Sequence, residues 1–484
     1  MIHAVGQNVF FCNYISKFGM ACHRGIIIFA TSNSAIKFFQ MERRIFMFLV
    51  FIPLLLRGQQ PGKTTGNWSS HFQFTTITQA HTGFRAGYKG AHSLADTVET
   101  GATTVTATLF LGARLWKGAA FYVDPEMSGG HGLSSAVGVA GALNGESYRV
   151  GNAAPAIFIA RAFLQQHIPL ANTGWEDIQD DANQLAEKIP TSRITISLGK
   201  FALGDFYDDN AYSHDPRTQF LNWALMGNGA WDYPANTRGY TMGLVVALVK
   251  PGWALRLSTV AVPRIANAPN LEYRLPDAHS ETLEAEKKIS IHSHPGTIRL
   301  LISNTHSKAP SYSEGLNAIA TNNSFLLNVI QGQAENTRYG GRKTGIGYSF
   351  DQELNSQIGF FSRGSWNDGR YATWAFTEID RSLSAGISIK GSKWNRPDDI
   401  GGLAIVSNWI SKKHRSFLES GGYGFIIGDG NLRYGAESIL EAYYSAYLSP
   451  HFWLTVDYQF VNHPAYNKDR GPVHVFGARA HVEF

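Results

Sequence analysis

Four aspartates lie close together in the middle of the chain, at positions 205, 208, 209 and 215. Paired carboxylates could hydrolyse a glycosidic bond, and several carboxylate oxygens could hold a cation such as Ca²⁺. Their spacing matches neither an EF-hand loop nor another known cation cage. Because arginines and aromatic residues surround them, the residue types favour a constriction in which acids and arginines face each other. The candidate residues for it are Arg114, Arg193, Asp205, Asp208, Asp209, Asp215, Arg217, Trp223, Trp231, Asp232 and Arg238.

Two strand patterns enclose most of these residues. Apolar and polar or small side chains alternate over 193–199 and again over 240–248, which predicts a strand at each end. The long connection between them is unusual in a compact domain unless it has a function. Within it, Asp215 followed by Pro216 predicts the start of a short helix that continues through Leu225. The two strands therefore carry a folded insert, which we expect to lie in or over a pore.

The clearest strand of the chain spans residues 102–115. Val105 and Leu109 belong to an apolar face, and Thr104 and Thr106 belong to a polar one. This alternation over ten or so residues is typical of a transmembrane barrel strand. The final segment, residues 473–484, alternates in the same way and ends on an aromatic residue.

The strand count and the repeat pattern define the fold class. Sixteen to eighteen candidate strands are present, and no repeat of 20 to 50 residues is visible. We predict an all-β fold: a closed antiparallel transmembrane β-barrel of about 16 strands, with 18 as the alternative, in which short helices in loops constrict the pore. A barrel of this size can hold an aqueous channel. Its last strand must pair with its first, because hydrocarbon leaves no partner for an open edge.

Several less regular stretches also carry predictions. Residues 180–188 are expected to form a helix, and 371–377 a strand that turns into 383–389. A further hairpin turn is expected at His294-Pro295-Gly296. The preceding His292-Ser293-His294 resembles a two-histidine metal clip, but its position beside a Pro-Gly pair favours a turn.

The N-terminal residues look like a targeting segment. Residues 41–60 have a basic start and a 12-residue apolar core, which predicts a signal peptide, and residues 1–40 then form a non-native upstream extension. Both cysteines lie in the first 60 residues, so disulfides are not expected in the remainder, 61–484. Six of the 42 basic and one of the 37 acidic residues also lie there, which leaves 36 of each. The remainder is neutral, so its charge gives no reason to expect nucleic-acid binding.

Three segments resemble the OprB-type family of carbohydrate-selective outer-membrane porins from Gram-negative bacteria. The longest is LGKFALGDFYDDNAYSHDPRTQFLNWALMGNGAWDYPANTRGYTMGL, residues 198–244. The others are residues 104–151 and residues 453–484. The resemblance implies a passive β-barrel channel that admits monosaccharides or short oligosaccharides. It also implies a location in the bacterial outer membrane, reached by export through a cleaved signal peptide.

The expected partners follow from this resemblance. They are sugars, outer-membrane lipids and the barrel assembly machinery, which would recognise the terminal Phe484; a homo-oligomer is an open alternative. No cofactor, metal or nucleic acid is expected, and the chain is not expected to be an enzyme.

Two other functions stay open at this point. The first is a general porin, or one selective for organic acids. The second is an outer-membrane barrel enzyme that uses the aspartate cluster.

Overall fold

The structure, a computed structural model, describes residues 66–147 and 153–484, which belong to one compact unit, Gly62–Phe484. The predicted upstream extension (1–40) and signal peptide (41–60) lie outside the described residues.

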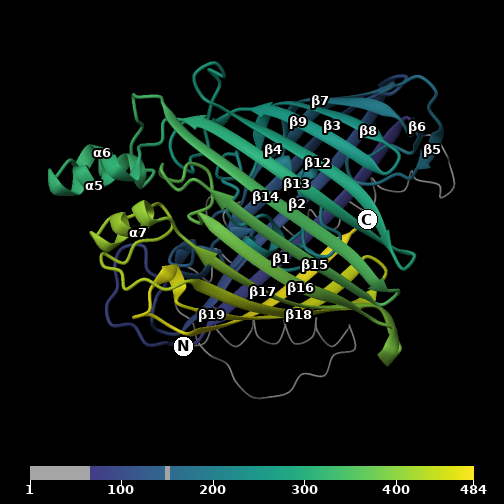
Figure 1. Ribbon diagram of the computed structural model, residues 1–484. Helices are drawn as coiled ribbons and strands as arrows, with labels where there is room; N and C mark the ends of the chain where they lie inside the picture. The colour runs from purple at the N-terminus through teal and green to yellow at the C-terminus, as the bar shows by residue number, and fades with distance from the viewer. Residues whose placement is uncertain (1–65, 148–152) are drawn as a thin grey trace, which may run out of the picture. The chain divides into compact units, whose positions relative to one another are not determined.

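Sixteen strands hydrogen-bond to their neighbours in chain order and close into one antiparallel barrel (Figure 1). The prediction of a closed barrel of about 16 strands is confirmed, and the alternative of 18 is wrong. The strands are β1 (Trp68–His81), β2 (Glu99–Trp116), β3 (Ala119–Gly130), β4 (Ala156–Pro169), β7 (Arg193–Phe201), β8 (Thr241–Lys250), β9 (Trp253–Val260), β12 (His279–Ile291), β13 (His294–Ser307), β14 (Gly341–Asn355), β15 (Ile358–Asn367), β16 (Arg381–Gly391), β17 (Arg396–Trp409), β18 (Glu437–Ser449), β19 (Phe452–Asn462) and β20 (Val473–Glu483).

Smaller elements lie in the connections. Two hairpins pair β5 (Trp175–Ile178) with β6 (Glu187–Pro190), and β10 (Val262–Pro263) with β11 (Leu271–Glu272). The helices described here are α4 (Trp223–Met226), α5 (Tyr312–Ala320), α6 (Ser324–Ile330) and α7 (Lys412–Glu419). Within 66–147 and 153–484, no helix combines the length and the apolar character needed to cross a membrane.

The two ends of the barrel differ in their connections. Five hairpins, β2–β3, β8–β9, β12–β13, β14–β15 and β18–β19, turn through two residues each at one end, which we call the short-turn end. The opposite, long-loop end carries α5, α6 and α7, whereas the β5–β6 hairpin lies at the short-turn end (Figure 1). In bacterial outer-membrane barrels the short turns face the periplasm and the long loops face outward.

The barrel closes because β1 pairs with β20. Phe74 lies opposite Val482 in this register. The pairing extends to the last residue, since the Phe484 N–H donates to the Phe72 carbonyl at 2.9 Å and the Phe72 N–H donates to the Phe484 carbonyl at 3.1 Å. Within the described residues, the 16-stranded barrel therefore has no unpaired strand edge, as a bilayer interior requires.

The final strand alternates as predicted. Arg479 and His481 point inward and are almost fully buried, whereas Phe476 points outward with 51% of its surface exposed. The inner face is not polar throughout, however, because Val473 and Val475 also point inward and are fully buried. They belong to a hydrophobic core inside the barrel.

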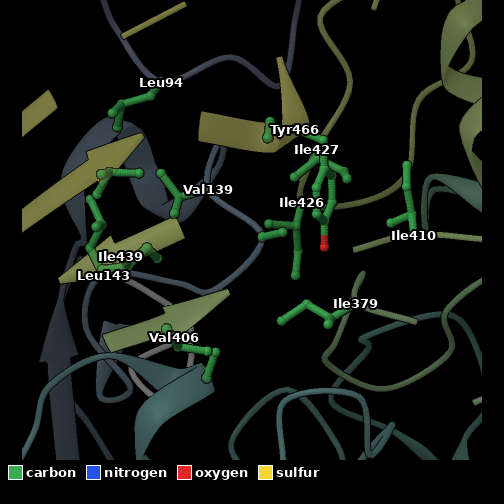
Figure 2. Close-up of a cluster of buried hydrophobic side chains, with 14 of the residues drawn as sticks. Leu94, Val139, Leu143, Ile379, Val406, Ile410, Ile426, Ile427, Ile439 and Tyr466 are labelled. Carbon is green, nitrogen blue, oxygen red and sulfur yellow. The ribbon is translucent and has the colours of Figure 1, made fainter. Parts of the chain in front are cut away.

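That core fills part of the barrel interior. It joins inward-facing residues of β17 and β18, such as Val406 and Ile439, to loop residues such as Val139 and Ile427 (Figure 2). The loops therefore pack inside the long-loop end instead of standing away from it. The open channel is consequently narrower than the space that the 16-stranded wall encloses.

Two predicted helices are wrong. Residues 180–188 include a tight β-bridge and the start of β6, not a helix. The helix expected from Asp215 to Leu225 is a single turn, followed by a separate helix, α4, that Asn222 caps. The reason is local: the N–H groups of Leu221 and Asn222 donate to the carboxylate of Glu441 on β18, which interrupts the helical bonding.

Two hairpin predictions also need correction. Residues 371–377 form a loop because the N–H groups of residues 374–376 donate to Asp232, and β16 pairs with β15 instead. The β12–β13 turn consists of His292 and Ser293, the two residues directly before the predicted turn at His294-Pro295-Gly296. Both turn residues have positive φ, 50° and 66°, as a two-residue type I′ hairpin requires.

Glu437 on β18 offers a test of how the interior is held. Its buried carboxylate accepts the N–H groups of Ala140, Gly141 and Ala465 at 2.7–2.9 Å. Glu437→Ala leaves these donors unpaired, so we expect the free energy of unfolding to fall by roughly 3 kcal/mol, about 1 kcal/mol per donor. Urea unfolding in lipid vesicles measures it. Glu437→Gln, which retains an acceptor oxygen, should lose less; an unchanged stability in both variants would contradict this account.

Candidate functional site

The insert of residues 202–240, which connects β7 to β8, crosses the interior of the barrel. Phe220 and Leu225 pack in the core described above, against inward-facing residues of β15 and β17–β20. Tyr207 and Trp231 belong to a second hydrophobic cluster, which includes inward-facing residues of β3, β4, β8, β9 and β13. The insert therefore contacts opposite parts of the wall, and the sequence-based expectation that it lies in the pore is met.

Charged side chains of the wall hold the insert's irregular backbone. Arg363 on β15 donates to the carbonyl of Leu225 at 2.8 Å and also to that of Ser213. Arg479 on β20 donates to the carbonyls of three residues of one turn, Pro216, Thr218 and Gln219, at 2.6–2.9 Å. A buried loop needs such partners, because it has no neighbouring strand to satisfy its N–H and C=O groups.

The aspartates of the cluster differ in their surroundings. Asp205 accepts two hydrogen bonds of 2.6 Å from the Arg161 guanidinium, one from Nε and one from Nη2. Asp208 is buried and accepts from Arg363 Nε at 2.8 Å. Asp209, by contrast, is exposed. Since two of the carboxylates already have arginine partners, this arrangement does not favour a cation cage or an acid–base pair.

Asp215 and Arg217 belong to a network that reaches the opposite wall. The Asp215 carboxylate accepts the backbone N–H of Arg217 at 2.9 Å. The buried Arg217 guanidinium contacts Glu126 and Glu146 at 3.2 Å each, and donates to Gln73 at 2.8 Å. This arginine is therefore fixed in place with two acids beside it.

A cavity of about 300 Å³ lies along the insert. Its lining contains six of the sequence-predicted candidates, together with aromatic and amide side chains. The predicted residues are Asp205, Asp208, Asp215, Arg217, Trp223 and Trp231, and they are joined by Tyr207, Asn228, Tyr233 and Phe376. A volume of this size is at the lower end of what small-molecule sites require.

Aromatic rings form one side of this cavity. The Trp223 ring stacks on Phe376 with centroids 5.1 Å apart and an angle of 21° between planes. Tyr233 meets Trp223 and Trp231 edge-on at 5.9 and 5.2 Å. Burial raises the pKa of the Tyr207 phenol well above its ordinary value, so its hydroxyl stays neutral. The rings offer flat apolar faces without charge.

Two buried side chains in the cavity lining lack hydrogen-bond partners for their polar atoms. The Trp231 indole N–H, and both the amide nitrogen and oxygen of Asn228, find no partner among the residues that the structure describes. The two residues are 6% and 3% exposed. Buried polar groups are nearly always paired, so these donors and this acceptor are suited to a polar ligand or to water inside the cavity.

The remaining predicted residues lie elsewhere. Arg114 and Arg193 are at the short-turn end and contact the β5–β6 hairpin, through Glu187 at 2.6 Å and Glu176 at 3.3 Å. Neither lines the cavity, so their positions do not support a place in the constriction. They fasten a hairpin to the rim.

Asp232 and Arg238 are not in the cavity lining either. Asp232 has a structural position, since its carboxylate accepts three consecutive N–H groups of residues 374–376. Arg238 lies over the Phe158 ring at 4.0 Å and donates to Ser128 at 3.1 Å, both on the wall.

Sequence reasoning missed several wall residues that complete the site. Arg161, Arg363 and Glu441 occupy inward positions of β4, β15 and β18, where a charge interrupts a run of apolar or small neighbours. That interruption was the available signal. Asn228 gave no signal, because an amide in a Gly-rich segment is typical of a loop.

The chain was compared with known proteins. The sequence profile described as "Carbohydrate-selective porin, OprB family" matches residues 94–484. Porin AaxA of Chlamydia abortus (strain DSM 27085 / S26/3) is 23% identical over 303 residues, which are 61% of this chain and 55% of that porin; the match thus spans about half of the relative's length. The high-pH structure of Pseudomonas putida OprB aligns with a TM-score of 0.60 and 15% identity, over 86% of this chain and 94% of that one. The structural likeness supports the barrel fold, and the profile match shows that the chain belongs to the OprB family of carbohydrate-selective porins.

Proposed function

We propose that the chain is a passive outer-membrane channel through which monosaccharides or short oligosaccharides diffuse, with weak binding in the cavity of the insert. The observation that carries this proposal is the cavity itself, in which stacked aromatic rings lie beside the unpaired polar groups of Asn228 and Trp231. A sugar ring has an apolar C–H face and a rim of hydroxyl groups. The cavity offers a complementary surface to each.

Weak binding is compatible with rapid flux. A selective channel must bind its solute well enough to draw it in and loosely enough to release it. One aromatic contact and a few hydrogen bonds, each worth about 1 kcal/mol net, provide binding of this strength. The process requires no energy source.

The charge pattern argues against the first alternative, a channel for organic acids. Such a channel needs arginines that are available to an anion. Arg161, Arg217 and Arg363 each already contact at least one carboxylate. The second alternative, a barrel enzyme, is disfavoured because Asp205 and Asp208 are held by different arginines, Arg161 and Arg363.

Three further expectations remain proposals. They concern a signal peptide at 41–60, a non-native extension at 1–40, and recognition of Phe484 by the barrel assembly machinery. Crosslinking in membranes would test whether the barrel forms a homo-oligomer.

Liposome swelling with a series of solutes tests the proposed function. We expect rapid swelling with pentoses and hexoses, slower swelling as oligosaccharide length grows, and weaker permeation by organic acids of similar size. Equal rates for gluconate and glucose would instead favour the general or acid-selective porin.

Trp231→Phe tests the unpaired indole N–H. The variant keeps an aromatic ring but removes one donor from the cavity, so we expect sugar block of single-channel current to weaken about fivefold, the equivalent of about 1 kcal/mol. Titration of the current in a planar bilayer measures this. Trp394→Phe, at the short β16–β17 turn and 43% exposed, is the matched control and should behave as the unaltered chain does. Equal weakening in both variants would exclude a specific role for Trp231.

Asp208→Asn and Asp209→Asn form a matched pair of neighbours. Asp208→Asn leaves the buried Arg363 without its anionic partner, which typically costs 3–5 kcal/mol, so the insert should loosen and the channel conductance should rise. Asp209→Asn alters an exposed side chain and should change conductance little. Similar conductance in the two variants would mean that the Asp208–Arg363 ion pair does not hold the insert. Loss of a hydrolytic activity in both would support the enzyme alternative.

A further inference from the structure

Two histidines lie opposite each other on neighbouring strands, far from the cavity of the insert. His279 at the start of β12 and His306 near the end of β13 are cross-strand partners at the long-loop end. Their rings stack with centroids 4.8 Å apart and an angle of 12° between planes. Glu281 follows His279 by two residues, so it shares the same face of the strand. That face points outward, because the alternate residues Ser280 and Thr282 are fully buried inside.

The three side chains bring their ligand atoms together. One nitrogen from each histidine and one carboxylate oxygen of Glu281 all lie within 4.8 Å of one another. Among the described residues this is the one such group of three histidine, cysteine or acidic side chains. Two histidines directly opposite on an antiparallel pair, with a carboxylate one step along, provide three ligands on a rigid frame.

The hydrogen bonds around His279 leave a lone pair directed at the carboxylate. Its Nδ1 lies 2.6 Å from the Leu275 carbonyl, which can only accept, so Nδ1 carries the proton. Its Nε2 lies 3.3 Å from Glu281 Oε1. A metal ion could take Nε2 and the carboxylate oxygen together, since both ligand atoms are on the same side of the strand pair. A backbone carbonyl on the second nitrogen is also the usual partner of a metal-bound histidine.

His306 is compatible with the same role. Its Nε2 lies 2.9 Å from the Asn304 side-chain nitrogen, so the ring accepts a hydrogen there and retains a lone pair on that nitrogen. The Asn304 amide nitrogen also donates to Glu281 at 3.3 Å, so a metal ion would displace this one donor from both ligands.

We propose that His279, Glu281 and His306 form a binding site for one divalent transition-metal ion, with Zn²⁺ as the best match. Two imidazoles and one carboxylate, with a fourth position left to water, are an established zinc ligand set. Nitrogen ligands disfavour Ca²⁺ and Mg²⁺, which prefer oxygen. The ion would tie together the long-loop ends of β12 and β13, just above the outward-facing Leu283 and Ile302, which are 37% and 51% exposed.

A neighbouring cation opposes this site and provides a useful variant. Arg342 on β14 is the register partner of His306 and is exposed. Its positive charge weakens metal binding without blocking it. Arg342→Gln should therefore bind Zn²⁺ more tightly than the unaltered chain.

Calorimetric titration of the detergent-solubilised full chain with Zn²⁺ tests the proposal, with the two cysteines alkylated beforehand. We expect one saturable Zn²⁺ per chain, tighter binding in Arg342→Gln, and no displacement by Ca²⁺ or Mg²⁺. Loss of a side chain that only hydrogen-bonds to a metal ligand already lowers metal affinity roughly 10- to 100-fold, so His279→Ala and His306→Ala, which remove a ligand itself, should each lose about 100-fold or more.

The matched control is His474→Ala, an exposed histidine at the long-loop end of β20 that lies beside Tyr458. It should bind Zn²⁺ as the unaltered chain does. Glu281→Gln, a milder change, guards against misfolding, and heat-modifiable migration on gels checks that each variant is folded. Folded variants that bind Zn²⁺ with unchanged affinity, or an unaltered chain without one saturable site, would overturn the assignment.

Discussion

The structure depends on one requirement: the polar backbone of an irregular insert must find partners inside a closed sheet. A strand satisfies its own N–H and C=O groups through its neighbours, but residues 202–240 cannot. Buried charges on the inner wall do this instead. Arg363 and Arg479 bind carbonyls, while Glu441 binds N–H groups. The same side chains thus hold the constriction in position and set its shape.

This requirement explains why the channel is narrower than its strand number suggests. Loops at the long-loop end pack a hydrophobic core against one part of the wall, and the aromatic half of the insert packs against the opposite part. The cavity lies along the insert, between charged and aromatic side chains. The number of strands therefore sets the circumference of the barrel, whereas the contents of its lumen set the opening.

The sequence predicted the barrel well because barrel strands follow a simple local rule. Alternation identified most strands, the closing strand and the insert between β7 and β8. It failed where a distant group controls the backbone. Residues 371–377 look like a strand, but Asp232, more than a hundred residues away, takes their N–H groups. Likewise, composition cannot show that Arg114 and Arg193 face a rim hairpin while Arg217 faces the lumen.

The position of Arg479 has a consequence for the order of assembly. This residue is on the C-terminal strand, yet it binds carbonyls of the insert about 260 residues earlier in the chain. The part of the wall that binds this segment of the insert is thus complete only when the last strand has been added. A nascent or truncated chain can pair its early hairpins and can pack the aromatic half of the insert, but it lacks the β20 side chain that binds residues 216–219. The constriction therefore reaches its final form late, when β20 pairs with β1 and closes the barrel.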